Sequence, residues 1–283
     1  MIVFAQPIEQ FPQRLAIVTV PVFSAGADAN FPSKNLLSYD RTQVARTTAN
    51  SVQINWDFGR NRKFDVVSLI DSNIGVRGIW TISGSTDGTN YVVLKASDAF
   101  WAHIVGTVAT IPAGAATDED LDPRRTAPVR NSSFFYSQST VYNYRYLRIQ
   151  VSDADAGTGM TFGRLFVGRV FRPKTSYQYG SRLIFDDSSN RERTDQGALI
   201  LDPGRTIVGA SVKMDFLSTN EVYDFIYDFN YWRGSARELL CCLDVNTPAR
   251  LSKNLLYATI TEGRTVTADQ FEAWSQTWTL ESI

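Results

Sequence analysis

The feature of this sequence that most constrains its fold is a strict alternation of apolar and polar side chains in several short runs. In residues 52–58 the apolar side chains occupy every second position, and residues 146–151 repeat this pattern. Because successive side chains of a β-strand point to opposite faces, the alternation predicts strands that are buried on one face. Asp87 and Gly88 lie between two further β-rich runs, where they predict a tight hairpin. Antiparallel strands at this spacing are typical of a β-sandwich.

A cluster of basic residues, Arg60, Arg62 and Lys63, follows the first run. Its flanks are strand-like, so we predict that the cluster forms a solvated turn between two strands. A nucleic-acid contact is the alternative interpretation of such a cluster. However, the net charge of −1 and the pI near 5.9 lack the basic excess of a general nucleic-acid binder. We therefore predict no nucleic-acid partner.

One helix is predicted in the C-terminal part of the chain. Ser218 precedes Glu221 by three residues, which is the signature of a capping box at a helix N-terminus. Apolar side chains then recur at helical spacing before Gly234, a stop signal; they are Val222, Phe225, Ile226 and Phe229. Strand-like runs precede and follow this segment, so its apolar face is expected to pack on a β-sheet.

The sequence divides into three predicted segments. Residues 1–29 form a β-rich N-terminal arm that pairs with the C-terminal domain. Residues 30–170 form the sandwich, and residues 171–283 form an α+β domain. Pro173 and its polar neighbours mark the boundary between these two domains. The predicted fold class is therefore mainly β, with one amphipathic helix packed on a β-sheet in the second domain.

The two cysteines of the chain, Cys241 and Cys242, are adjacent. Neighbouring side chains of a strand point to opposite faces, so a disulfide between them would be severely strained. No Cys/His spacing of the kind that binds zinc is present. We therefore predict a chain without disulfides, metal ions or cofactors.

Residues 1–20 lack the basic region and the continuous apolar core of a signal peptide, because Pro7, Glu9 and Arg14 interrupt them. No run reaches the roughly 18 apolar residues of a membrane-spanning helix. The sequence therefore predicts a chain that is made and folded in the cytoplasm and has no membrane span.

A candidate binding region follows the predicted hairpin. Residues 106–143 are rich in Pro, Ser, Thr and acidic side chains, which predicts a long loop, and long loops often carry binding sites. Trp101, Tyr136 and Tyr142 lie in or beside this region. They have the character of aromatic side chains that stack on sugar rings. The interpretation we favour is that they cover the core or contact a neighbouring subunit.

The sequence offers little for catalysis. The single histidine, His103, lies among apolar residues and beside Trp101, where a packing role is expected. No nucleophile motif, phosphate-binding loop or dinucleotide fingerprint is present. Asp153 and Asp155, or the acidic residues 118–122, are the alternative of a calcium site, but turn formation explains them better. We predict that the protein is not an enzyme.

Residues 30–170 resemble the galactose-binding-like β-sandwich, the family that includes discoidin and coagulation-factor C-type domains. The resemblance is carried by INWDFG (54–59), WTISGSTDGTNY (80–91), RYLRI (145–149) and FGRLFVG (162–168). It implies a jelly-roll topology in which the last two of these runs are the final paired strands.

The C-terminal part is similar to minor tail and distal tail proteins of long-tailed bacteriophages. The similarity lies in GRLFVGRVFRPK (163–174), GASVKMDF (209–216), FNYWRG (229–234) and WSQTWTLESI (274–283). It implies a structural protein of the virion tail tip, made in the bacterial host cytoplasm. Its implied partners are tail tube, hub and tape measure proteins and further copies of itself, in a homo-oligomer such as a hexameric ring. The chain departs from the family in domain order, because the better-known relatives place the ring domain first.

Two functions are therefore expected from the sequence. The leading one is a structural component of the tail tip that assembles with the tail tube and hub. The alternative is a carbohydrate-binding or receptor-binding module that recognises host cell-surface glycans. A glycan-cleaving enzyme is the least expected class.

Overall fold

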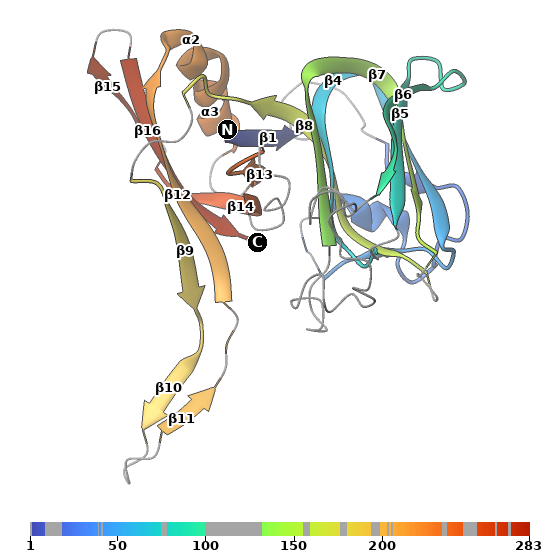
Figure 1. Cartoon of the computed structure of the whole chain (residues 1–283), viewed down its shortest axis with the longest axis horizontal. Coiled ribbons are helices and arrows are strands. Elements are labelled where there is room, and N and C mark those ends of the chain that lie inside the picture. The colour runs from blue at the N-terminus through green and yellow to red at the C-terminus, as the bar shows by residue number, and fades with distance from the viewer. Residues whose placement is uncertain are drawn as a thin grey trace, which may run out of the picture. The chain divides into compact units, whose positions relative to one another are not determined.

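Figure 1 shows a computed structural model of the chain, which separates into two compact units. Unit 1 comprises Met1–Phe4, Phe171–Leu243 and Leu256–Ile283, and unit 2 comprises Ala5–Val170 and Asp244–Leu255. The structure describes residues 2–8, 19–38, 40, 42–74, 78–99, 132–154, 159–175, 180–193, 199–202, 204, 206–233, 237–245, 254–263, 265–270 and 273–283.

Unit 2 is built from antiparallel strands. Their bounds are β2 (Val22–Phe23), β3 (Ala45–Arg46), β4 (Ser51–Ser72), β5 (Ile79–Ser85), β6 (Val92–Ala99), β7 (Ser132–Ser152) and β8 (Thr161–Phe171). They follow the order β6-β5-β7-β4-β8, with β2 added to β4 and β3 added to β8. A short 3-10 helix, η2 (Ser33–Leu37), precedes β3. β1 (Val3–Pro7) begins among the residues of unit 1 and ends among those of unit 2.

The long strands β4 and β7 pair with each other through both of their halves. The first half of β4 pairs with the end of β7, and the second half pairs with its beginning. Figure 1 shows the two strands curving together at one end of unit 2. The second half of β4 also pairs with β8, whereas the end of β7 pairs with β5, so two layers form. Apolar side chains from both halves of β4 lie in one core, as a sandwich requires.

The side chains predicted to point inward do so. The apolar positions of the two alternating runs are at most 3% exposed; they are Val52, Ile54, Trp56, Phe58, Leu147, Ile149 and Val151. For β8, alternation predicted that one face would be polar and exposed. The structure differs, because Arg164 and Phe166 on that face are also buried. The Arg164 guanidinium is accommodated by donating to the carbonyl oxygen of Leu36 at 3.1 Å.

The structure contradicts the turn that was predicted at the basic cluster Arg60, Arg62 and Lys63. β4 continues through these residues, and a register shift between Asp57 and Arg62 takes up the extra length. Gly59 has a φ of 73°, and its N–H donates to Asp57 Oδ1 at 2.7 Å. The residues that favour a turn thus form a bulge within the strand, and Arg62 is buried rather than solvated.

The predicted hairpin is present as the antiparallel pair β5 and β6, but its connection is longer than a tight turn. Residues 86–91 make this connection, and Gly88 adopts a φ of 79° within it. The carboxylate of Asp87 accepts hydrogen bonds from the N–H groups of Thr89 at 2.9 Å and Asn90 at 2.8 Å. These bonds hold the pKa of Asp87 below its usual value, with the Asn90 contribution the largest.

The prediction of a long loop over residues 106–143 is wrong for its C-terminal part. β7 begins at Ser132, so residues 132–143 form part of the longest strand pair of the unit. Their Ser, Thr and Tyr side chains suit an extended strand as well as a loop, and composition alone misled the prediction. Residues 106–131 lie outside the described residues.

The strands of unit 1 also pair in an antiparallel sheet. The strands are β9 (Arg182–Asp187), β10 (Asn190–Arg193), β11 (Leu199–Asp202), β12 (Thr206–Leu217), β13 (Glu238–Cys242), β14 (Leu255–Glu262), β15 (Val266–Gln270) and β16 (Ala273–Ser282). Their order is β13-β14-β16-β12-β9, with β15 on β16. β10 and β11 pair separately and prolong the hairpin of β9 and β12 as a two-stranded arm (Figure 1).

The predicted helix is confirmed and packs on this sheet. It consists of α2 (Thr219–Glu221), a π-helical segment η6 (Val222–Tyr227) and α3 (Asp228–Arg233). Both hydrogen bonds of the Ser218 and Glu221 capping box are present. Val222, Ile226 and Phe229 are at most 5% exposed and belong to the core of unit 1. Phe225 is only partly buried, and its ring stacks on that of Phe171 with centroids 4.1 Å apart.

The mainly β fold class, with one helix packed on an antiparallel sheet, is thus confirmed. Within the described part of the chain, the helical segments fall short of the length and apolar character that a membrane-crossing helix requires.

Candidate functional site

Two of the three aromatic residues singled out in the sequence lie together. The hydroxyl oxygens of Tyr136 and Tyr142 are 3.1 Å apart, and the Tyr136 hydroxyl also bonds to the carbonyl oxygen of Leu94 at 2.8 Å. Tyr136 is 7% exposed, whereas Tyr142 is only partly buried. The pair therefore presents mainly Tyr142 to solvent. Trp101 lies outside the described residues.

Tyr136 is surrounded by core aromatic side chains. Its ring meets the buried Trp80 edge-on at 6.0 Å, and the Lys95 ammonium lies 5.8 Å from its centroid. Burial raises the pKa of Tyr136 above its usual value, and the hydrogen bond with Tyr142 adds to this rise. Tyr136 therefore stays neutral over the physiological pH range and acts as a core residue with a hydrogen-bonded tip.

A second group of side chains lies on the layer formed by β5, the end of β7 and the first half of β4. Its members on β4 and β7 are exposed or half-buried, whereas Ser83 and Ser85 on β5 are buried. Cross-strand pairing arranges the group in three rows, which run across β4, β7 and β5. We call this surface the polar face; its rows are Gln53, Gln150 and Thr81, then Asn55, Arg148 and Ser83, then Asp57, Tyr146 and Ser85.

Hydrogen bonds order the amide groups of the polar face. The Asn55 side-chain oxygen accepts from Gln53 Nε2 at 2.9 Å and from Arg148 Nε at 3.3 Å. Gln150 Nε2 donates to Gln53 Oε1 at 3.4 Å. Gln150 is exposed, and Gln53, Asn55 and Arg148 are half-buried. Planar amide and guanidinium groups are thus held side by side with part of their polar edge in solvent.

The edge of the polar face carries an ion pair. Arg145 donates to both carboxylate oxygens of Asp57, at 2.8 and 2.9 Å. These hydrogen bonds, with a further one from the Gly59 N–H, hold the pKa of Asp57 below its usual value. The side chains of Arg145 and Asp57 are 39% and 30% exposed. A charged, partly solvated pair of this kind positions neighbouring groups and contributes modestly to stability.

Two tyrosines add aromatic surface beside these polar groups. The Arg148 guanidinium lies over the Tyr91 ring at 3.5 Å, and the Arg145 guanidinium lies over the Tyr146 ring at 4.8 Å. Gly88 approaches the Tyr146 ring so closely that a Cβ on residue 88 would lie 3.2 Å from that ring. The loop of residues 86–91 therefore packs against the polar face and fixes both rings.

A shallow cavity lies beside the first row of the polar face. Its volume is about 190 Å³, and its lining includes the exposed apolar residue Ile79. The other lining residues are Ser51, Trp80, Thr81, Gln150, Val151 and Ser152. Gln150 and Thr81 therefore belong both to the cavity and to the polar face.

The arrangement suits binding through hydrogen bonds and ring contacts. It supplies amide and guanidinium donors, amide and carboxylate acceptors, and aromatic rings within one surface, which is the mixture that sugar hydroxyl groups require. Within the ranges that the structure describes, no group of three or more His, Cys, Asp or Glu side chains is placed to hold a metal ion.

The other predicted candidates are placed as follows. Asp153 is 1% exposed at the end of β7, and its N–H donates to the carbonyl oxygen of Asn50 at 2.8 Å. Asp155, the acidic residues 118–122 and His103 lie outside the described residues.

Sequence reasoning did not single out the polar face as a site. Its outward residues are visible in the alternation, but their assembly into rows depends on the register between strands that are far apart in the chain. The available signal was the Gln, Asn, Arg and Tyr residues at the polar positions of the alternating runs.

Comparisons with known proteins give a fold-level likeness only. No protein-family model matches the chain, and no curated protein matches it. Among solved structures, the family 32 carbohydrate-binding module of NanJ from Clostridium perfringens, in complex with galactose, is 11% identical with a TM-score of 0.39. That match covers 60% of this chain and 99% of the module.

Two further solved structures have similar scores. A chitosan-binding module of a chitosanase/glucanase from Paenibacillus is 14% identical with a TM-score of 0.38, over 54% of this chain and 94% of the module. A GH29 fucosidase from Ruminococcus gnavus is 13% identical with a TM-score of 0.38, over 54% of this chain but only 25% of the enzyme. Because these values are low, the function of this chain has to be derived from its own side chains.

Proposed function

We propose that this chain is a non-catalytic carbohydrate-binding protein whose ligand lies on the polar face of unit 2. The observation that carries the proposal is the ordered set of amide, guanidinium and tyrosine side chains across β4, β7 and β5. Hydrogen bonds within the set fix Gln53, Asn55 and Arg148, so little side-chain freedom is lost when a ligand binds.

The chemistry of a saccharide matches this surface. Each hydroxyl group of a sugar needs both a donor and an acceptor, and neighbouring amide groups supply both. The apolar face of a sugar ring packs on apolar or aromatic surface, which Ile79 and Tyr91 provide at the margin. The carbohydrate-binding modules among the similar structures are consistent with this proposal.

The test is a glycan-binding assay with the full chain, comparing Gln150→Ala and Arg148→Met. Each variant removes polar groups that the ligand would contact, so we expect affinity to fall by about tenfold for the guanidinium and severalfold for the amide. Lys34→Ala is the matched control, because Lys34 is an exposed basic residue on η2 and lies outside the polar face.

Two results would count against the polar face as the site. The first is a chain that binds no glycan across a broad array of bacterial surface polysaccharides. The second is loss of binding in Tyr142→Ala with full binding in Gln150→Ala, which would move the ligand to the tyrosine pair.

A second candidate function, assembly within a phage tail tip, is favoured by the two-stranded arm of unit 1. The arm begins at β9, which is the last strand in the order of its sheet. It carries three exposed apolar side chains: Leu183 is 48% exposed, Phe185 is 67% exposed and Leu201 is 60% exposed. Apolar residues on an edge strand mark contact with another chain, and an isolated two-stranded hairpin is marginally stable in water. We propose that this arm pairs with another copy of the chain.

Light scattering across a concentration series tests this second candidate. The wild type is expected to form a discrete oligomer, and Phe185→Ser is expected to shift its mass toward the monomer. Tyr231→Ser is the control, because Tyr231 is equally exposed, at 67%, but lies on α3. A wild type that stays monomeric at every concentration, or a Phe185→Ser oligomer of unchanged mass, would argue against self-assembly through the arm.

A further inference from the structure

Unit 1 contains a cavity of about 380 Å³ where two β-bulges meet the same stretch of β16. In β12, two residues, Asp215 and Phe216, lie opposite the single residue Ser275. In β15, Asp269 is the extra residue between the pairs Ala268–Trp274 and Gln270–Ala273. Bulges re-aim side chains and often lie beside functional sites, and the volume falls within the range of ligand pockets.

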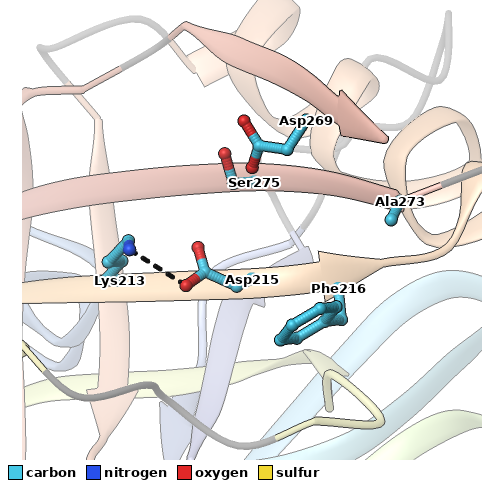
Figure 2. Close-up of a pocket in the computed structure, with 6 residues that line it drawn as sticks. All are labelled: Lys213, Asp215, Phe216, Asp269, Ala273 and Ser275. Carbon is cyan, nitrogen blue, oxygen red and sulfur yellow. Dashed lines mark ion pairs between the residues drawn. The ribbon is translucent and has the colours of Figure 1, made fainter. Parts of the chain in front are cut away.

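The bulges direct polar atoms from three strands into this cavity. Figure 2 shows the carboxylate of Asp269 next to the hydroxyl of Ser275, with the carboxylate of Asp215 on the neighbouring strand pointing toward them. Lys213 completes the polar lining, and its ammonium lies 3.0 Å from Asp215 Oδ2.

Hydrogen-bond acceptors exceed donors in this lining. Lys213 engages one oxygen of Asp215, but the other oxygen, Oδ1, is buried and has no hydrogen-bond partner among the described residues. A buried carboxylate oxygen without a donor is costly, so a ligand that brings a donor to it gains affinity. The two carboxylates and one ammonium of the lining sum to a formal charge of −1, which favours a cation.

Phe216 adds an aromatic surface to the same cavity. It is 63% exposed, and its φ of 58° lies in the left-handed region that non-glycine residues rarely adopt. A phenylalanine kept in this conformation and in solvent contributes little to folding, whereas the face of its ring attracts a cation.

From these observations we infer that the cavity is a binding site for an organic cation, a guanidinium or primary ammonium group on an apolar stem. The N–H groups of the cation donate to Asp215 Oδ1, to the Asp269 carboxylate and to Ser275 Oγ. Its stem and charge lie against Phe216. Such a group belongs either to a free small amine or to an arginine or lysine side chain of a polypeptide, and both present the same chemistry. This site is independent of the polar face of unit 2.

Titration of the full chain with defined probes, followed by NMR or calorimetry, tests the inference. The probes are the ethylguanidinium ion, a capped Gly-Arg-Gly peptide and the same peptide with citrulline, a neutral isostere, in place of arginine. We expect both cations to bind, with affinity falling as salt is added, and the citrulline peptide to bind at least about tenfold more weakly. Peptide binding much tighter than that of ethylguanidinium identifies a polypeptide as the source, and equal binding identifies a free amine.

The variants Asp215→Asn and Asp269→Asn keep side-chain shape and remove one charge each, so both are expected to weaken cation binding about tenfold. Asp269 is exposed, so its variant reports on binding even if Asp215→Asn impairs folding. Asp186→Asn on the exposed β9 strand is the matched control and should bind as the wild type does. Equal affinity for the arginine and citrulline peptides, or full binding by Asp269→Asn with intact Asp215, would overturn the inference.

Discussion

At the scale of single residues, the ion pair of Asp57 and Arg145 links the strand bulge to the polar face. The Asp57 carboxylate accepts from Arg145 and also from the Gly59 N–H, so one side chain holds the bulge and orients a neighbouring cation. Because these bonds favour the ionised carboxylate, the pKa of Asp57 is lower in the folded chain than in the unfolded chain.

This lowered pKa predicts a pH dependence with a defined sign. The contribution of Asp57 to stability is present above its unfolded pKa, about 4, and is lost as the pH falls through the lower folded pKa. Asp57→Asn should therefore reduce the midpoint of urea unfolding at pH 7 and leave it nearly unchanged near pH 2. Equal losses at both pH values would show that the pair acts through packing rather than charge.

At the scale of elements, the helix of unit 1 combines a sequence-encoded start with a tertiary distortion. The capping box of Ser218 and Glu221 is local and was readable from two residues. The π-helical segment was not readable, because the helical spacing of Val222, Phe225 and Ile226 suits a regular helix equally well. Packing of Phe225 on Phe171, which lies far away in the sequence, accompanies the wider turn.

Two substitutions separate the cap from the packing. Ser218→Ala is expected to lower the free energy of unfolding of unit 1 by about 1 kcal/mol, because the Glu221 N–H loses its side-chain acceptor at the helix start. Phe229→Ala should cost about 3–5 kcal/mol, since Phe229 is fully buried against Trp278 with ring centroids 4.8 Å apart. Denaturant unfolding measures both values, and a larger loss in Ser218→Ala than in Phe229→Ala would contradict this ranking.

The same contrast between local and non-local signals applies to the strands and sites. The inward positions of β4 and β7 followed from alternation, whereas the continuation of β4 through Gly59 depended on pairing with a distant strand. The polar face and the cavity beside Phe216 depend on register and on bulges that face β16. Neither register nor bulge position is specified by a short stretch of sequence, so neither site was predicted.

At the scale of the whole molecule, the buried apolar side chains of the described residues form two hydrophobic cores. One comprises apolar residues of the sandwich, including Ile54 and Trp56, and the other comprises apolar residues of unit 1, including Phe229 and Trp278. Chains with more than one core often depart from two-state unfolding.

We therefore expect two transitions in denaturant, each assigned by a core substitution. Ile54→Ala should lower the midpoint of one transition and Phe229→Ala that of the other, because the first costs about 2–5 kcal/mol and the second about 3–5 kcal/mol of unfolding free energy. Far-UV circular dichroism and tryptophan fluorescence would follow the two steps. A single transition that both substitutions shift equally would show that the units unfold together.

The adjacent cysteines of β13 provide a way to observe unit 1 alone. Cys241 and Cys242 are both fully buried and form no disulfide, and burial raises the pKa of Cys241 well above its usual value. A buried, protonated thiol does not react with alkylating reagents, so labelling occurs only when the strand becomes accessible. The rate of thiol labelling in native buffer thus measures how often this core opens, and Phe229→Ala should accelerate it while Ile54→Ala should not.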